Sequence, residues 1–174
     1  IKEGHKDFGE NKVQEAFEKW HDIKSEYVDL RLHLLGGLQT NKVKFAVKIF
    51  DFIHSVDSKK LAKKIKEEQT KQDKKVKIFL QVNIGNEYQK FGISKNELDD
   101  LYMFCKEIEL DVIGLMCIPP IDLDPVPFFK ELKNLNNKLN LPELSMGMSS
   151  DYEKAIENYS TYLRIGTDIF GKRD

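Results

Sequence analysis

Apolar residues recur along the chain in short runs, and these runs alternate with longer stretches of helical periodicity. The short runs predict strands near Lys6, Leu32, Phe52, Ile78, Ile113, Leu144 and Leu163. Between them, apolar positions recur every three or four residues, which predicts helices with one buried face. Strands that strictly alternate with helices are typical of a parallel sheet, either a barrel or a doubly wound layer.

Polar residues at the helix starts refine this pattern. Asp57 or Ser58 is predicted to cap the lysine-rich helix that follows the third strand. Ser150, with Glu153 three positions later, has the spacing of a capping box, so a helix is predicted to begin there. No GxGxxG segment follows the first strand, which argues against a dinucleotide-binding domain.

Composition and charge predict a single soluble, globular domain. The chain has 174 residues, of which 40% are hydrophobic and 33% charged, and its net charge is -1. The balanced charge gives no electrostatic reason to expect nucleic acid as a partner, and no apolar run is long enough to span a bilayer. Cys105 and Cys117 form no CxxC pair, which argues against a disulfide framework or a zinc site and fits a cytoplasmic protein.

Two turns in the last quarter of the chain combine glycine with hydroxyl-bearing residues. Gly147 and Ser149 follow the sixth strand, and Gly166 and Thr167 follow the seventh. Glycine lets a ligand approach the backbone closely, and free N–H groups at a helix start attract anions. Two such turns side by side would suit one phosphate, which barrels bind after strands 7 and 8. Either turn alone could equally be ordinary, so spacing does not establish a phosphate site.

A closed (β/α)8 barrel needs eight strands, and this sequence predicts seven. A missing strand leaves unpaired N–H and C=O groups on both neighbouring edges. We therefore expect the strands at Lys6 and Leu163 to lack a shared neighbour.

Six segments in order give the sequence a specific resemblance: FGENKVQEA, LHLLGGLQTNK, FIHSVDS, GLMCIPP, LSMGMSSDYEKAI and LRIGTDIFGKRD. They resemble the pyridoxal 5′-phosphate (PLP) homeostasis proteins, single-domain relatives of the alanine racemase barrel of fold type III. The resemblance covers the chain from about Gly4 to Asp174. It implies an α/β fold, a (β/α)8 TIM barrel of the alanine racemase type lacking its first strand and helix, and one PLP-binding domain over residues 1–174.

The resemblance also implies where the family's covalent lysine lies. In the family, an Ala-Val-Ser-Lys strand precedes FGEN, and its lysine forms a Schiff base with the cofactor. This sequence begins just before FGEN, and none of its lysines matches that position; Lys12, Lys42 and Lys90 stand where the family has other roles. Because the chain also lacks an initial methionine, we expect it to begin at a processing point or part-way through a longer protein.

Other cofactor-binding positions carry over from the resemblance. Arg164 matches the arginine that faces the pyridine nitrogen; an arginine keeps its proton and leaves that nitrogen unprotonated. The phosphate would meet the Ser149 hydroxyl and the backbone of Gly166 and Thr167. The remaining matches around the pocket are Asn11, His33, Met116 and Ser145, the last acting through indirect hydrogen bonds.

Considered without the family, three of these residues have simpler interpretations. His33 lies in an apolar strand and could be a core histidine with its hydrogen bonds satisfied. Met116 could serve only packing, and Asn11 could be a helix N-cap. His5, His21 and His54 have no partner at ligand spacing, so no metal site is predicted.

The function implied by the resemblance is non-catalytic binding of PLP for intracellular PLP homeostasis. Its partners would be PLP and PLP-dependent apoenzymes, with neither nucleic acid nor membrane involved. The second domain that supplies a catalytic tyrosine in the racemases is missing from this sequence, which argues against racemase activity. Two alternatives stay open: a truncated remnant without covalent PLP binding, and a barrel enzyme acting on another phosphorylated metabolite, with Glu10 and Asp168 as acidic candidates.

Overall fold

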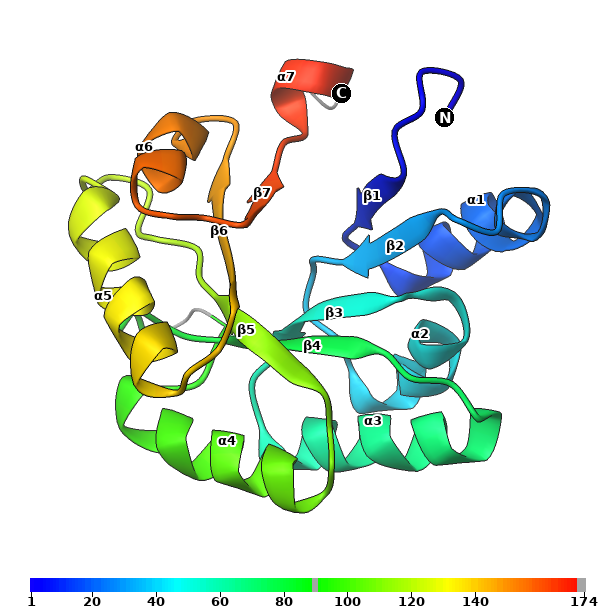
Figure 1. Ribbon diagram of the computed structural model, residues 1–174, viewed down its shortest axis with the longest axis horizontal. Helices are drawn as coiled ribbons and strands as arrows, with labels where there is room; N and C mark the ends of the chain where they lie inside the picture. The colour runs from blue at the N-terminus through cyan, green and yellow to red at the C-terminus, as the bar shows by residue number, and fades with distance from the viewer. Residues whose placement is uncertain (89–90, 172–174) are drawn as a thin grey trace.

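The fold is a parallel sheet that curves into a nearly closed barrel, as seen in a computed structural model that describes residues 1–88 and 91–171 (Figure 1). Within these residues all seven predicted strands are present, and they pair in sequence order. They are β1 (Asp7–Glu10), β2 (Arg31–Leu34), β3 (Phe52–Val56), β4 (Lys77–Gln81), β5 (Val112–Met116), β6 (Glu143–Met148) and β7 (Tyr162–Arg164). Lys90 and the last three residues of the FGKRD segment lie outside the described residues.

Helices follow the strands and cover the outside of the sheet (Figure 1). They are α1 (Val13–Glu26), α2 (Val43–Ile49), α3 (Lys59–Gln72), α4 (Leu98–Glu107), α5 (Val126–Lys138), α6 (Tyr152–Glu157) and α7 (Thr167–Phe170), with short 3-10 turns at Thr40–Lys42 and Lys95–Glu97. The pattern of apolar residues did not predict α7, because four residues are too few to show a helical period. Within the described residues, no helix combines the length and apolar character needed to cross a membrane.

One predicted helix cap is confirmed and one is wrong. The Ser58 hydroxyl accepts a hydrogen bond from the Leu61 N–H at the start of α3. Before α6, by contrast, the N-cap position is Asp151 rather than Ser150. The Asp151 carboxylate turns back and accepts a hydrogen bond of 2.6 Å from the Met148 N–H, which ties the turn to the end of β6.

The two faces of the sheet have different roles. Outward-facing residues such as Leu34, Ile53 and Leu80 are fully buried against the helices and belong to the main core. A smaller cluster of Phe52, Phe79 and Met116 packs on the inner face. Because side chains alternate along a strand, the inner face also carries the polar residues that share this register.

The strands β1 and β7 form the two edges of the sheet. Among the described residues, β1 pairs with β2 alone and β7 with β6 alone. This confirms the expectation that the strands at Lys6 and Leu163 do not share a neighbour. The segment before β1 and the short helix α7 lie on the side of the molecule where these edges face each other (Figure 1).

Candidate functional site

The two predicted turns lie side by side at the carboxyl ends of β6 and β7. The Ser149 hydroxyl lies 3.4 Å from the Gly166 backbone nitrogen and 3.4 Å from that of Asp168. Gly147 was predicted to follow the sixth strand but lies within β6. It has a φ of +93°, a left-handed conformation that favours glycine, and the pairing of β6 with β7 shifts register between Ser145 and Met148. A hydroxyl and two backbone N–H groups therefore converge at one point, a combination that suits an anion.

Arg164 ends β7 and extends its guanidinium into the barrel interior. Nη1 donates to the Ser145 hydroxyl and Nη2 to the Cys117 carbonyl, both at 2.9 Å. Burial lowers the pKa of Arg164, and the charge of nearby Asp151 opposes this effect. Among the described residues, no carboxylate forms an ion pair with the guanidinium. A half-buried cation in this state favours an acceptor supplied by a ligand.

Two histidines extend the polar interior from Arg164 toward the other end of the barrel. Ser145 Oγ lies 2.8 Å from His54 Nδ1, and His54 Nε2 lies 3.0 Å from His33 Nδ1. His33 Nε2 lies 3.0 Å from Oδ1 of Asp7, the first residue of β1. Each histidine ring stacks on a phenylalanine, with 4.2 Å between ring centroids for both His33 on Phe52 and His54 on Phe79.

Burial favours the neutral form of both imidazoles. It lowers the pKa of His33, although the hydrogen bond with Asp7 acts in the opposite direction. It lowers the pKa of His54 well below the usual value, and the charges of His33 and Arg164 add to this. Burial also acts to raise the pKa of Asp7, but its interactions with His33 and Arg31 outweigh burial and hold that pKa below its usual value.

The predicted site residues fall into four groups. His33, Ser145 and Arg164 belong to the hydrogen-bonded network of the barrel interior. Ser149 and Gly166 contact each other in a separate cluster at the two turns. Met116 lines the interior by packing against the phenylalanines. The other two predicted residues are Asn11 and Thr167.

Among the described residues, the Asn11 side chain forms no hydrogen bond with the polar network. The Ser149 hydroxyl meets the backbone nitrogens of Gly166 and Asp168 rather than the predicted backbone of Thr167. Asn11 is not the N-cap of α1 either, since that position is Lys12. The backbone of Asn11 instead packs against Gly36.

Sequence reasoning missed His54, Asp7 and Tyr162. His54 shares the inner face of β3 with Phe52, two residues earlier, and this alternation was the available signal. Tyr162, on β7, contacts both histidine rings. Its neighbours come from other strands, so spacing along the chain could not reveal them.

The two acidic candidates for a barrel enzyme lie outside the polar network. Glu10 Oε1 accepts hydrogen bonds from Trp20 Nε1 at 2.7 Å and Lys19 Nζ at 2.8 Å, both on α1. Asp168 is exposed on α7. Neither carboxylate contacts Arg164 or the histidines, so the geometry does not favour them as an acid and base acting in the barrel.

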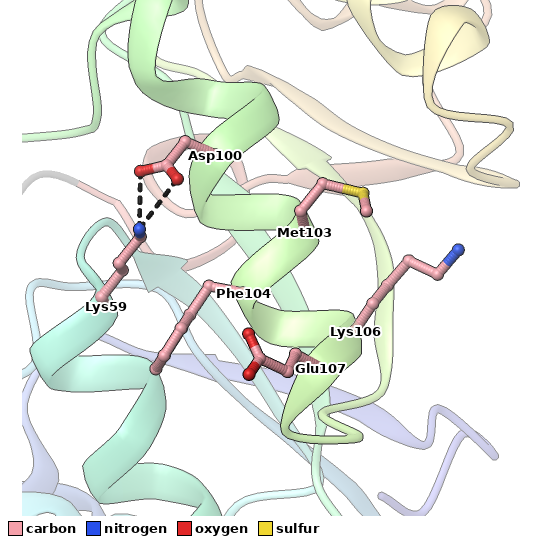
Figure 2. Close-up of a pocket in the computed structure, with 6 residues that line it drawn as sticks. All are labelled: Lys59, Asp100, Met103, Phe104, Lys106 and Glu107. Atoms are coloured by element: carbon pink, nitrogen blue, oxygen red, sulfur yellow. Dashed lines mark hydrogen bonds and ion pairs between the residues drawn. The ribbon is translucent and has the colours of Figure 1, made fainter.

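A separate hollow of about 490 Å³ lies on the outer surface, between α3 and α4 (Figure 2). Figure 2 shows the Lys59 ammonium and the Asp100 carboxylate paired at one end of it. Met103 and Phe104 supply apolar surface, and Lys106 and Glu107 complete the lining. This hollow belongs to the helical layer and shares no residue with the network around Arg164.

Comparison with known proteins places this geometry in a family. The whole chain, residues 1–174, matches the family model of the alanine racemase N-terminal domain. The "Pyridoxal phosphate homeostasis protein" of Aquifex aeolicus is 41% identical over 180 residues, which cover 98% of this chain and 78% of the relative. The Escherichia coli K12 protein of the same name is 35% identical, covering 100% of this chain and 79% of the relative.

The chain belongs to the pyridoxal phosphate homeostasis protein family. Solved structures agree with this assignment. PipY of Synechococcus elongatus has a TM-score of 0.89 at 36% identity without PLP, covering 97% of this chain and 83% of PipY. The PLP-bound form of PipY has a TM-score of 0.88 at 34% identity, covering 97% and 82%. An alanine racemase of Clostridium difficile, 16% identical with a TM-score of 0.75, shares the fold.

Proposed function

We propose that this homeostasis-family protein binds PLP in its barrel and acts as a non-catalytic carrier that passes the cofactor to PLP-dependent apoenzymes. Two kinds of evidence support the proposal. The curated relatives are named for PLP homeostasis, and PipY, at 34% identity, has been solved with PLP bound. The barrel interior of this chain also presents groups that complement two separate parts of the cofactor.

The observation that carries the proposal is the half-buried guanidinium of Arg164 beside the two carboxyl-end turns. Arg164 is two residues before Gly166, so one strand end supplies both the cation and a backbone N–H. A Cβ placed on Gly166 would have no heavy atom within 4 Å, which leaves space beside this backbone for a phosphate. The residues present therefore fit a ligand that carries both a phosphate and a ring acceptor.

Each part of the site has a separate task in this proposal. The Ser149 hydroxyl and the backbone N–H groups of Gly166 and Asp168 bind the phosphate oxygens. Arg164 donates to the pyridine nitrogen and keeps its own proton. When bound, PLP supplies an aldehyde for amines and a ring that accepts electrons. An arginine at the ring nitrogen weakens that electron acceptance, which suits a carrier more than a catalyst.

The test measures PLP affinity by equilibrium dialysis for the wild-type chain and an Arg164→Gln variant. Removing this donor is expected to raise the Kd for PLP by roughly 10- to 100-fold, since a hydrogen bond to a charged group contributes about 1.5–3 kcal/mol. Arg31→Gln is the matched control, because Arg31 lies on β2, away from the two turns, and pairs with Asp7 on an exposed surface. Equal Kd values for all three proteins would contradict the proposal.

A further inference from the structure

The polar groups inside the barrel form one continuous path across it. The path begins at Arg164, at the carboxyl end of β7, and ends at Asp7, at the amino end of β1. Its four steps measure 2.9, 2.8, 3.0 and 3.0 Å, through Ser145, His54 and His33. Three of these residues are buried, and the Asp7 carboxylate at the end of the path is partly exposed to solvent.

The chemistry of the two ends fixes the direction of donation. An ionised carboxylate can only accept, so His33 must donate to Asp7 through Nε2–H. A neutral His33 then accepts at Nδ1, and His54 must donate through its own Nε2–H. His54 therefore accepts at Nδ1 from the Ser145 hydroxyl, which leaves the Ser145 oxygen to accept from Arg164. An arginine can only donate, so the direction agrees at both ends.

The charges around the two imidazoles are consistent with neutral rings between charged ends. The titratable groups that act on them are Asp7 on β1, Arg31 on β2, Asp51 before β3, and Tyr162 and Arg164 on β7. The Asp7 carboxylate also pairs with Arg31, and its interactions with His33 first and Arg31 second hold its pKa below the usual value. The stacked phenylalanine rings hold each imidazole plane, so the rings cannot easily turn to exchange their nitrogens.

We propose that Asp7, His33, His54 and Ser145 form a one-way hydrogen-bond chain that positions the Arg164 guanidinium for its ligand. This inference rests on the proposed function, because it concerns the same site. The Ser145 oxygen holds Nη1 and the Cys117 carbonyl holds Nη2, so two acceptors fix the plane of the guanidinium. Asp7 is therefore a positioning residue. It acts on Arg164 through the hydrogen-bond chain across the barrel and does not contact the ligand.

An Asp7→Asn variant tests the chain without changing its shape. An asparagine amide can either accept or donate, so it no longer forces His33 into one tautomer. Reversal of the chain then becomes possible, and Ser145 would accept from both His54 and Arg164. Arg31→Gln is the matched control, since it also removes the Asp7–Arg31 pair but keeps the carboxylate that ends the chain.

The first readout does not depend on a ligand. Nitrogen-15 NMR of the wild-type chain at neutral pH is expected to show both His33 and His54 protonated at Nε2 and unprotonated at Nδ1. Arg31→Gln should keep this pattern, and Asp7→Asn should give a mixture of tautomers at His33. Protonation of either histidine at Nδ1 in the wild type would overturn the proposed direction.

The second readout is the Kd for PLP, with inorganic phosphate as a probe of the turns alone. Asp7→Asn is expected to raise the Kd for PLP by roughly 3- to 10-fold relative to Arg31→Gln, which is the size of one ordinary hydrogen bond, and to leave phosphate binding unchanged. Equal PLP affinities in the two variants would overturn the positioning role. If the wild type binds no PLP, the proposed function and the positioning role both fail, while NMR still decides the direction of the chain.

Discussion

At the scale of single residues, the site depends on side chains whose neighbours come from other strands. Ser149 illustrates this, because its hydroxyl meets backbone N–H groups that follow the next strand. A serine in a turn is common and indicates little by itself. The approach of Gly166 and Asp168 makes this hydroxyl part of an anion-binding group.

A Ser149→Ala substitution should weaken PLP binding. Removing the Ser149 hydroxyl deletes a hydrogen bond to a charged phosphate, which costs about 1.5–3 kcal/mol and corresponds to roughly a 10- to 100-fold higher Kd. Ser150→Ala is the matched control, since Ser150 is the exposed neighbour in the same turn. Fluorescence titration with PLP measures the Kd of both variants. An equal loss of PLP affinity in both would show that the Ser149 hydroxyl does not bind the phosphate.

At the scale of secondary-structure elements, a close backbone contact joins two turns near the β1 edge of the sheet. The turn after β1 and the turn after β2 meet where Asn11 packs against Gly36. A Cβ on Gly36 would lie 2.1 Å from the Asn11 carbonyl oxygen, a separation that real atoms do not tolerate. Backbone forms both sides of this contact, so a clash there could be relieved only by moving a turn.

A Gly36→Ala substitution is therefore expected to destabilise the protein by about 1–3 kcal/mol, as overpacking of a rigid contact does. Gly37→Ala is the matched control, because a Cβ there would meet the Phe91 ring at 3.4 Å, an ordinary contact. Its effect should stay within about 0.5 kcal/mol. Urea denaturation followed by circular dichroism measures the free energy of unfolding of both variants. Similar urea midpoints for the two variants would contradict the expected clash between Gly36 and Asn11.

The sequence predicted the elements better than the contacts between them. Hydrophobic periodicity located every strand in the described residues, since burial on both faces of a parallel sheet leaves a strong apolar signal. The pairing of His54 with Ser145 joins residues 91 positions apart, and no local pattern carries that information. Ser150 was mistaken for a cap because Asp151 competes for the same role, and tertiary geometry decides between them.

At the scale of the whole molecule, the buried histidines couple folding to pH. Both imidazoles have a pKa below the usual value in the folded protein, chiefly through burial. The unfolded chain therefore binds more protons than the folded one once pH falls below about 6.5. Stability from this source is present above that pH and decreases as pH falls toward the lowered pKa values.

We expect the free energy of unfolding to decrease between pH 7 and pH 5, by up to about 1.4 kcal/mol per pH unit for each histidine. Asp7 acts at lower pH: its pKa is held below the usual value, so its contribution is lost as pH falls through that lowered pKa. Urea denaturation at several pH values measures the slope, and a His54→Asn variant should show a shallower one. A wild-type slope of zero between pH 7 and pH 5 would contradict neutral buried histidines.

The open edge of the sheet and the polar interior are connected through β7, because this strand is an edge strand and also carries Arg164. In the proposed binding mode, this interior binds PLP through two groups, the paired turns and the guanidinium. A crystal structure of the protein grown with PLP would show whether both groups contact the cofactor. We expect a phosphate between Ser149 and Gly166 and a pyridine nitrogen beside Arg164. PLP found elsewhere, such as in the hollow between α3 and α4, with the barrel interior empty, would contradict it.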